Sequence, residues 1–205
     1  MRYDNFKHLA APFLDVSHET FIRLQVYADL LQLWQPKINL VSQSTINDLW
    51  SRHFIDSLQL IKHLPADSRV IDFGSGGGFP AAVLAVITGL PFTLVESDQR
   101  KCAFLLEVAR VTETPFKVLT QRIETLDQAL DFNVITARAF APLSKLLSLS
   151  APWLSRGAVG IFLKGRDAAL EIDDAKQGWS FSAALHPSVS DPAASILVVS
   201  DLTAR

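Results

Sequence analysis

An apolar strand pattern that runs into a glycine-rich loop is the feature that most limits how this chain can fold. Residues 70–73 read as the strand, residues 74–78 as the loop and residues 81–87 as a helix. Strand, glycine loop and helix in this order begin a βαβ unit. In a parallel sheet built from such units, a ligand lies beyond the carboxyl end of the first strand, where this loop is found.

The alternation of strand and helix patterns continues along the chain. It predicts a doubly wound, mostly parallel α/β sheet of seven strands, Rossmann-like and covered by helices on both faces. A closing hairpin would make the last strand antiparallel. The further strands are predicted at residues 92–96, 116–119, 132–136, 159–163, 179–185 and 195–199, and helices at residues 100–111, 123–130, 143–153 and 167–176.

Helical periodicity dominates the part of the chain before this sheet. Apolar residues recur at spacings of three and four over residues 17–34 and again over residues 46–64. A length of 205 residues fits one domain. We therefore expect a single domain over residues 1–205, with a helical extension at residues 1–65 and the sheet at residues 66–205.

Composition excludes several classes of protein. The single cysteine, Cys102, cannot form an intramolecular disulfide or a zinc cage. The first residues lack the apolar core of a signal peptide, and no run of about 18 apolar residues could span a membrane. These features predict a cytoplasmic protein without a bound metal. Because the net charge is -2, nucleic acid could be bound only through a local basic patch.

The spacing of the loop glycines indicates which ligand the loop holds. A dinucleotide fingerprint that begins at Gly74 and Gly76 needs a third glycine at position 79, where the chain has Phe79. A P-loop is excluded because no Gly-Lys-Ser or Gly-Lys-Thr follows. Glycines at Gly74, Gly76 and Gly78 favour S-adenosylmethionine, and a structural turn without a ligand is the alternative.

Glu96 ends the second predicted strand, beside this loop. A carboxylate there can accept both hydroxyls of a ribose, a contact shared by NAD and S-adenosylmethionine sites. It therefore supports a nucleoside cofactor without choosing one. The alternative is a solvated glutamate at a strand end.

Basic residues follow several of the predicted strands. Because the carboxyl ends of parallel strands meet at one edge of a sheet, these residues would form a positive rim around the ligand. Such a rim suits RNA phosphates and would make binding weaken with salt; the alternative is that Lys and Arg are common in any loop. The predicted RNA-binding residues are Arg100, Lys101, Arg122, Lys164 and Arg166.

The segment after the fourth predicted strand suggests which atom is methylated. Residues 136–142 lack the Asn/Asp-Pro-Pro-aromatic pattern of exocyclic-amine methylation and contain no cysteine nucleophile. Guanine N7 has a free lone pair and needs no deprotonation, so positioning and charge would suffice for catalysis. Arg138 could orient the guanine or a phosphate. Phe140 could stack on the base, although a place in the core is the favoured interpretation.

Five stretches of the chain together match a known family: residues 34–40, 52–57, 70–80, 122–124 and 137–141. On these the chain resembles the bacterial 16S rRNA guanine-N7 methyltransferases, also called the glucose-inhibited division protein B family. The segment Arg-His-x-x-Asp-Ser is more specific than the glycine loop. The resemblance implies methyl transfer from S-adenosylmethionine to N7 of one guanine in the decoding-region loop of 16S ribosomal RNA, as naked RNA or in a small ribosomal subunit precursor.

The resemblance also implies roles for single residues. Gly74 and Phe79 would line the methionine end of the cofactor, and Ile123 and Glu124 its adenine. Arg138 would contact the cofactor or the guanine, and it is the expected catalytic residue.

Arg52, His53 and Asp56 belong to the specific Arg-His-x-x-Asp-Ser segment. They are expected to fix the N-terminal helices against the glycine loop, with His53 buried and hydrogen-bonded rather than catalytic. The chain is expected to act as a monomer. Two alternatives stay open: a methyltransferase of a small molecule or a protein, and an RNA-binding scaffold without catalysis.

Overall fold

A seven-stranded sheet forms the centre of the protein, whose computed structural model describes residues 1–204. Its strands are β1 (Val70–Phe73), β2 (Phe92–Glu96), β3 (Lys117–Thr120), β4 (Val134–Arg138), β5 (Val159–Lys164), β6 (Trp179–Pro187) and β7 (Ser195–Ala204). The spatial order is β3-β2-β1-β4-β5-β7-β6. Strands β1 to β5 are parallel, whereas β7 is antiparallel to β5 and β6. The predicted doubly wound fold with an antiparallel last strand is confirmed.

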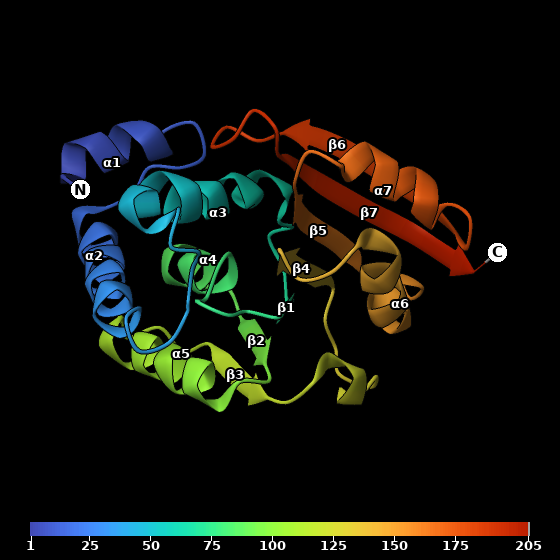
Figure 1. Cartoon of the computed structure of the whole chain (residues 1–205), viewed down its shortest axis with the longest axis horizontal. Helices are drawn as coiled ribbons and strands as arrows, with labels where there is room; N and C mark the ends of the chain where they lie inside the picture. The colour runs from blue at the N-terminus through green and yellow to red at the C-terminus, as the bar shows by residue number, and fades with distance from the viewer. Residues whose placement is uncertain (205) are drawn as a thin grey trace.

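Helices cover both faces of this sheet (Figure 1). The first five helices pack on one face, in one apolar cluster, and the last two pack on the other face, in a second cluster. The helices are α1 (Tyr3–Ala10), α2 (His18–Trp34), α3 (Asp56–Leu58), α4 (Ala81–Thr88), α5 (Gln99–Val111), α6 (Leu143–Leu154) and α7 (Ala168–Ala175). None of the helices within residues 1–204 has the length and apolarity to cross a membrane.

Alternating side chains of the central strand β1 reach both clusters. Val70 packs in the first cluster, whereas Ile71 and Phe73 pack in the second. Because neighbouring side chains of a strand point to opposite faces, a strand covered on both sides is mostly apolar. This explains the composition of β1 and β2, in which Asp72 and Glu96 are the ionisable exceptions.

Three segments differ from the sequence-based expectation. Residues 123–130 do not form a helix; they contain only a 3-10 turn, Ile123–Thr125, followed by a turn in which the Asp127 carboxylate accepts the N–H of Ala129. Such a local hydrogen bond competes with helix formation. The first helix, α1, is present although its short apolar pattern was not singled out. Residues 46–63 are helical but irregular, with a π-helical segment at Trp50–Ile55.

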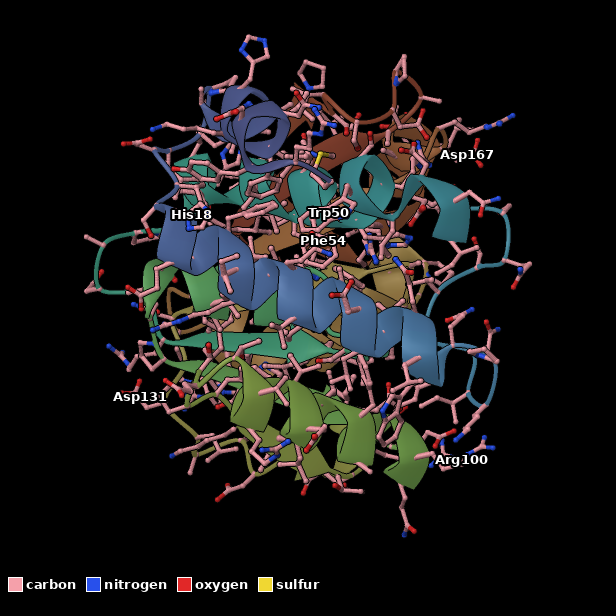
Figure 2. All side chains as sticks on the ribbon, turned by 90° about the vertical axis from the view of Figure 1, so that its left-hand side faces the viewer. His18, Trp50, Phe54, Arg100, Asp131 and Asp167 are labelled. Carbon is pink, nitrogen blue, oxygen red and sulfur yellow. The ribbon has the colours of Figure 1, made fainter. Side chains whose placement is uncertain are left out.

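The order of the strands changes direction beside β1, which pairs with β2 on one side and β4 on the other. The glycine loop follows β1 at this switch point, where ligands bind in open α/β sheets. In Figure 2, Arg100 and Asp167, which follow β2 and β5, lie on one side of the molecule. Asp131, which precedes β4, lies on the opposite side. The carboxyl ends of the strands therefore share one edge.

Tyr27 of α2 packs against the glycine loop and supports its backbone. Its side chain is fully buried, its ring stacks on Phe79 with centroids 5.5 Å apart, and its hydroxyl donates to the carbonyl of Gly77. Gly78 has no room for a side chain, because a Cβ atom there would meet the Tyr27 hydroxyl. Helix α2 thus fixes the backbone of a loop that lies fifty residues further along the chain.

We expect Tyr27→Phe to lower the free energy of unfolding by about 1–2 kcal/mol, because a buried carbonyl loses its donor. Urea denaturation measures the difference. Tyr3→Phe is the matched control, since the Tyr3 hydroxyl donates to the Val16 carbonyl in a half-buried place and water can replace it. Equal losses in the two variants would contradict a special contribution of Tyr27.

Candidate active site

Two cavities meet at the glycine loop. The larger has a volume of about 470 Å³ and lies between the loop, the Arg-His-x-x-Asp-Ser segment and the loop that joins β6 to β7. The smaller, of about 340 Å³, lies between the ends of β1, β2, β3 and β4. Both are lined by Gly74, Gly76, Lys101 and Ala139. The site is therefore one continuous cleft with two compartments.

The glycines of the loop serve different purposes. Gly74 and Gly76 adopt φ of 68° and 53°, a conformation that favours glycine. A Cβ atom on Gly74 would collide with the ring of Phe140, whereas one on Gly76 would meet nothing closer than 3.8 Å. Gly76 thus leaves the cleft open. Gly78 lines neither cavity and is buried against Tyr27, so the structure gives it a packing position instead of the expected place beside the cofactor.

Glu96 lies in the smaller cavity, where its carboxylate is held by three backbone N–H groups. One oxygen accepts from Ser97 at 2.7 Å and Asp98 at 2.9 Å, and the other accepts from Gly76 at 2.9 Å. A carboxylate has about four lone-pair directions, so one remains for a ligand on the oxygen that contacts Gly76. Glu96 therefore couples the end of β2 to the glycine loop.

Ile123 and Glu124 form another wall of the smaller cavity, together with Arg122 and Phe140. Ile123 is buried, and Glu124 is exposed and lies 3.8 Å from Lys145. Phe140 is 36% exposed, so the expectation of a core position is wrong. It is held at the surface because Ala139 adopts a left-handed φ of 50°, which turns the chain after β4.

Arg138 lies in the larger cavity at the end of β4. Its guanidinium donates to Nδ1 of His53 at 2.7 Å and to the carbonyl of Arg52 at 3.2 Å. It also lies 3.4 Å from a carboxylate oxygen of Asp56 and 5.0 Å from the ring centre of Phe79. The charge is thus paired, and the guanidinium plane is fixed beside the loop.

His53 is buried and hydrogen-bonded, as expected. Because Arg138 can only donate, Nδ1 of His53 is an acceptor and the ring proton resides on Nε2, which lies 2.8 Å from the hydroxyl of Thr45. Burial and the nearby positive charges of Arg138 and Arg52 lower the pKa of His53 to about 3. The imidazole is therefore neutral at physiological pH, and its lone pair is already engaged.

Asp56 joins the N-terminal segment to two distant parts of the chain. One oxygen faces Arg138, and the other accepts from Gln59 at 2.8 Å and from the hydroxyl of Ser190 at 2.5 Å. Arg52 reaches the same β6–β7 loop through Asp191, at 2.9 Å. The expected bracing of the glycine loop by this segment is thus indirect, through Arg138 and Phe79, and it extends to the β6–β7 loop.

Asp72 lies beneath the glycine loop on β1 and is fully buried. One of its oxygens accepts from the hydroxyl of Thr136 at 2.7 Å, and the other has no partner within residues 1–204. Burial raises the pKa of this carboxyl to about 7. Near neutral pH it therefore exists partly as the neutral acid.

Lys164 has a different position from the one expected for an RNA-binding residue. Its side chain is 8% exposed, and its ammonium group lies 2.5 Å from Glu171 and 3.1 Å from the carbonyl of Ala141. The same Glu171 carboxylate accepts the N–H of Leu143 at 2.6 Å. Lys164 and Glu171 therefore hold the segment between β4 and α6, which carries Phe140, and the ammonium group is not presented to solvent.

Of the predicted rim, Lys101 lines both cavities, Arg122 lines the smaller and the buried Lys164 lines the larger, whereas Arg100 and Arg166 line neither. Arg100, Arg122 and Arg166 are exposed, and Lys101 is half-buried. Figure 2 shows Arg100 at the outer end of α5, where it lies 3.2 Å from Asp98.

Two walls of the larger cavity were not found from the sequence. The first contains Leu40 and Val41, whose N–H groups donate to the side chain of Gln35 at 3.0 and 3.1 Å. The second is the β6–β7 loop with Ser190 and Asp191. Leu40 ends the family-matching stretch 34–40 but was given no role at the site, and the β6–β7 loop carries no motif. Within residues 1–204 no three His, Cys, Asp or Glu side chains gather as metal ligands.

We expect Lys164→Met to lower the free energy of unfolding by about 3 kcal/mol, near the lower end for breaking a buried ion pair, because Glu171 is itself a quarter exposed. Differential scanning calorimetry measures the loss. Lys176→Met is the control, since Lys176 pairs with Asp173 at 3.9 Å on the surface and should change stability little. A similarly small loss of stability in both variants would show that the buried ion pair does not stabilise the fold.

Comparison with known proteins identifies the family of this chain. The family model described as rRNA small subunit methyltransferase G matches residues 21–195. The protein named ribosomal RNA small subunit methyltransferase G from Paramagnetospirillum magneticum is 50% identical over 183 residues, 89% of each chain. The proteins of that name from Gluconobacter oxydans and Brucella ovis are 48% and 44% identical over 91% and 98% of this chain, and 96% of their own.

Solved structures agree on the fold. A mutant of MtNAS in complex with S-adenosylmethionine aligns with a TM-score of 0.60 at 18% identity, over 87% of this chain and 75% of its own. The ribosomal protein L11 methylase of Lactobacillus delbrueckii subsp. bulgaricus aligns with a TM-score of 0.59 at 15% identity, over 73% and 78%. From the family match over most of its length and from its close relatives, the chain belongs to the rRNA small subunit methyltransferase G family.

Proposed function

We propose that this protein transfers the methyl group of S-adenosylmethionine to N7 of a guanine in 16S ribosomal RNA. The observation that carries the proposal is the cleft of two compartments that meet at Gly74 and Gly76. A nucleoside cofactor fits the smaller compartment, and a flipped base fits the larger. The reacting atoms then meet at the glycine loop, and all walls of the cleft come from one chain, as suits a monomer.

The smaller compartment suits the adenosine part of the cofactor. Glu96 keeps a free lone-pair direction for a ribose hydroxyl, and Ile123 offers an apolar face to an adenine ring. The open space over Gly76 admits the methionine part, which a Cβ atom at Gly74 would disturb by displacing Phe140. When bound, S-adenosylmethionine supplies an electrophilic methyl group on a sulfonium.

The larger compartment suits a guanine whose N7 points to the glycine loop. N7 is a neutral nitrogen with a free lone pair, so no general base is needed at this atom. His53 supports this reading because its lone pair is bound to Arg138 and its pKa is lowered to about 3. The protein therefore accelerates the reaction by holding the base in line and excluding water.

Arg138 is the residue that we assign to positioning the base. It lies between Phe79 and the larger compartment, and its guanidinium can donate to guanine O6 without blocking N7. Methylated guanine carries a positive charge, which an isolated guanidinium would repel. Asp56, 3.4 Å from Arg138, offsets that charge.

The exposed basic residues around the cleft suit RNA phosphates. Arg100, Lys101, Arg122 and Arg166 follow three different strands; Lys101 lines both compartments and Arg122 lines the smaller. Because the net charge of the chain is -2, this local rim and not the overall charge would attract RNA, as naked 16S RNA or in a small-subunit precursor in the cytoplasm.

Transfer of labelled methyl from S-adenosylmethionine to small-subunit RNA that lacks the modification tests the function. We expect label at a single guanine, located by N7-specific strand cleavage. Label on a small molecule or a protein instead of RNA would replace the proposal by another methyltransferase activity. Binding of RNA without any heat of binding to S-adenosylmethionine or S-adenosylhomocysteine would indicate a scaffold without catalysis.

Arg138→Lys tests the positioning of the base. Lysine keeps the charge but loses the planar fork, so we expect kcat/KM for RNA to fall by about 100-fold or more. Arg110→Lys is the control, because Arg110 pairs with Glu107 on the exposed face of α5. Affinity for S-adenosylhomocysteine, measured by calorimetry, shows whether the variant is folded. Near wild-type turnover in Arg138→Lys would contradict the assignment.

A further inference from the structure

The β6–β7 loop forms the wall of the larger cavity that lies beyond Arg138 and Arg52. It is fixed by contacts with the N-terminal segment: Gln59 donates to the hydroxyl of Ser188 at 3.0 Å and accepts the N–H of Val189 at 3.0 Å. The hydroxyl of Ser190 donates to Asp56. A loop held in this way presents its next residue, Asp191, in a defined position.

Asp56 and Asp191 are the carboxylates that line this cavity within residues 1–204. Asp56 is 8% exposed, and its oxygens already face Arg138, Gln59 and Ser190. It has little capacity left for a ligand. Asp191 is the carboxylate that keeps free hydrogen-bond acceptor positions.

Asp191 has one protein partner on each oxygen. One oxygen lies 2.9 Å from the guanidinium of Arg52, and the other accepts the N–H of Ala193 at 2.9 Å. Each oxygen has about two lone-pair directions, so each keeps one. The Ala193 N–H and then Arg52, with a smaller contribution from Arg166, hold the pKa of Asp191 below its usual range. The carboxylate is therefore ionised at neutral pH.

Guanine offers donors that match such a carboxylate. Its N1–H and its exocyclic 2-amino group lie side by side on the Watson–Crick edge, at the end of the purine away from N7. If N7 points to the glycine loop, this edge points toward the opposite wall of the cavity. Adenine has no N–H at N1 and no 2-amino group, so an acceptor pair on that wall would select guanine.

We propose that Asp191 is a specificity-determining residue that accepts hydrogen bonds from N1–H and the 2-amino group of the acceptor guanine. The proposal rests on the proposed function and adds the means by which the base is recognised. Arg52 orients the carboxylate and leaves its outer lone pairs free.

The charge of the surroundings supports this assignment. Arg52, Lys101 and Arg138 line the same cavity, and Arg166 lies close enough to Asp191 to lower its pKa. In a cleft that binds RNA, a carboxylate repels phosphates and so weakens the nonspecific part of binding. The N–H groups of the bases are the part of RNA that a carboxylate attracts. Asp191 is therefore suited to binding a base and not to binding a phosphate.

The test compares RNA that has guanosine at the acceptor position with the same RNA that has inosine there. Inosine keeps N7, O6 and N1–H but lacks the 2-amino group. We expect wild-type kcat/KM to be about 10- to 100-fold lower for inosine RNA, the cost of one lost hydrogen bond to a charged acceptor. Asp191→Ala should lower kcat/KM for both RNAs, but more for guanosine RNA, which loses two hydrogen bonds to the carboxylate, than for inosine RNA, which loses only the one from N1–H. The ratio of kcat/KM for guanosine RNA to that for inosine RNA should therefore approach one.

Two further variants separate direct contact from indirect effects. Arg52→Gln removes one of the two groups that hold the Asp191 carboxylate, whereas the N–H of Ala193 remains. It should lower kcat/KM for both RNAs while it keeps their ratio well above one. Asp173→Ala removes an exposed carboxylate of α7 and should leave both values unchanged. Calorimetry with S-adenosylhomocysteine shows that each variant is folded.

The outcomes distinguish this inference from the proposed function. If the wild type methylates no guanine in RNA, the proposed function itself fails. If it methylates guanosine RNA but the ratio to inosine RNA is the same in Asp191→Ala, the inference is overturned and the function stands. A ratio that collapses equally in Arg52→Gln would assign discrimination to the ion pair and would also overturn the direct contact.

Discussion

The buried guanidinium of Arg138 is the interaction on which the rest of the site depends. It joins β4 to His53 and Asp56 of the N-terminal segment and stacks over Phe79 at the end of the glycine loop. Because arginine stays charged in proteins, its burial requires a carboxylate and neutral acceptors around it. Asp56, the neutral His53 and the carbonyl of Arg52 meet that requirement. Three distant parts of the chain are therefore fixed around one charge.

The same network divides the cleft into compartments with different chemistry. On the side of β2, the Glu96 carboxylate is held by backbone N–H groups and faces a space suited to a nucleoside. On the side of the β6–β7 loop, charged side chains face a space suited to a base. The glycine loop separates the two compartments, and the hydroxyl of Tyr27 fixes its backbone. The helical segment before the sheet is thus part of the site and not an appendage to it.

The fold and many residues of the smaller compartment followed from local patterns. Strand periodicity, the loop glycines and the acidic end of β2 lie within about thirty residues of one another, and each pattern acts through its own backbone. Predictions from the sequence were wrong where the same residue pattern can adopt more than one structure. Residues 123–130 have helical spacing but form turns around Asp127, and Lys164 follows a strand like its basic neighbours but is buried against Glu171.

The sequence by itself determined the order of strands and helices, the position of the glycine loop and the family, because these depend on periodicity and on short motifs. Tertiary structure alone decided which polar residues meet. Asp191 and Arg52 are 139 positions apart, and Lys164 and Ala141 belong to different strand ends. Such pairs depend on which loops the sheet brings together, and a single sequence carries no periodic signal for them. The larger compartment of the cleft is built from pairs of this kind.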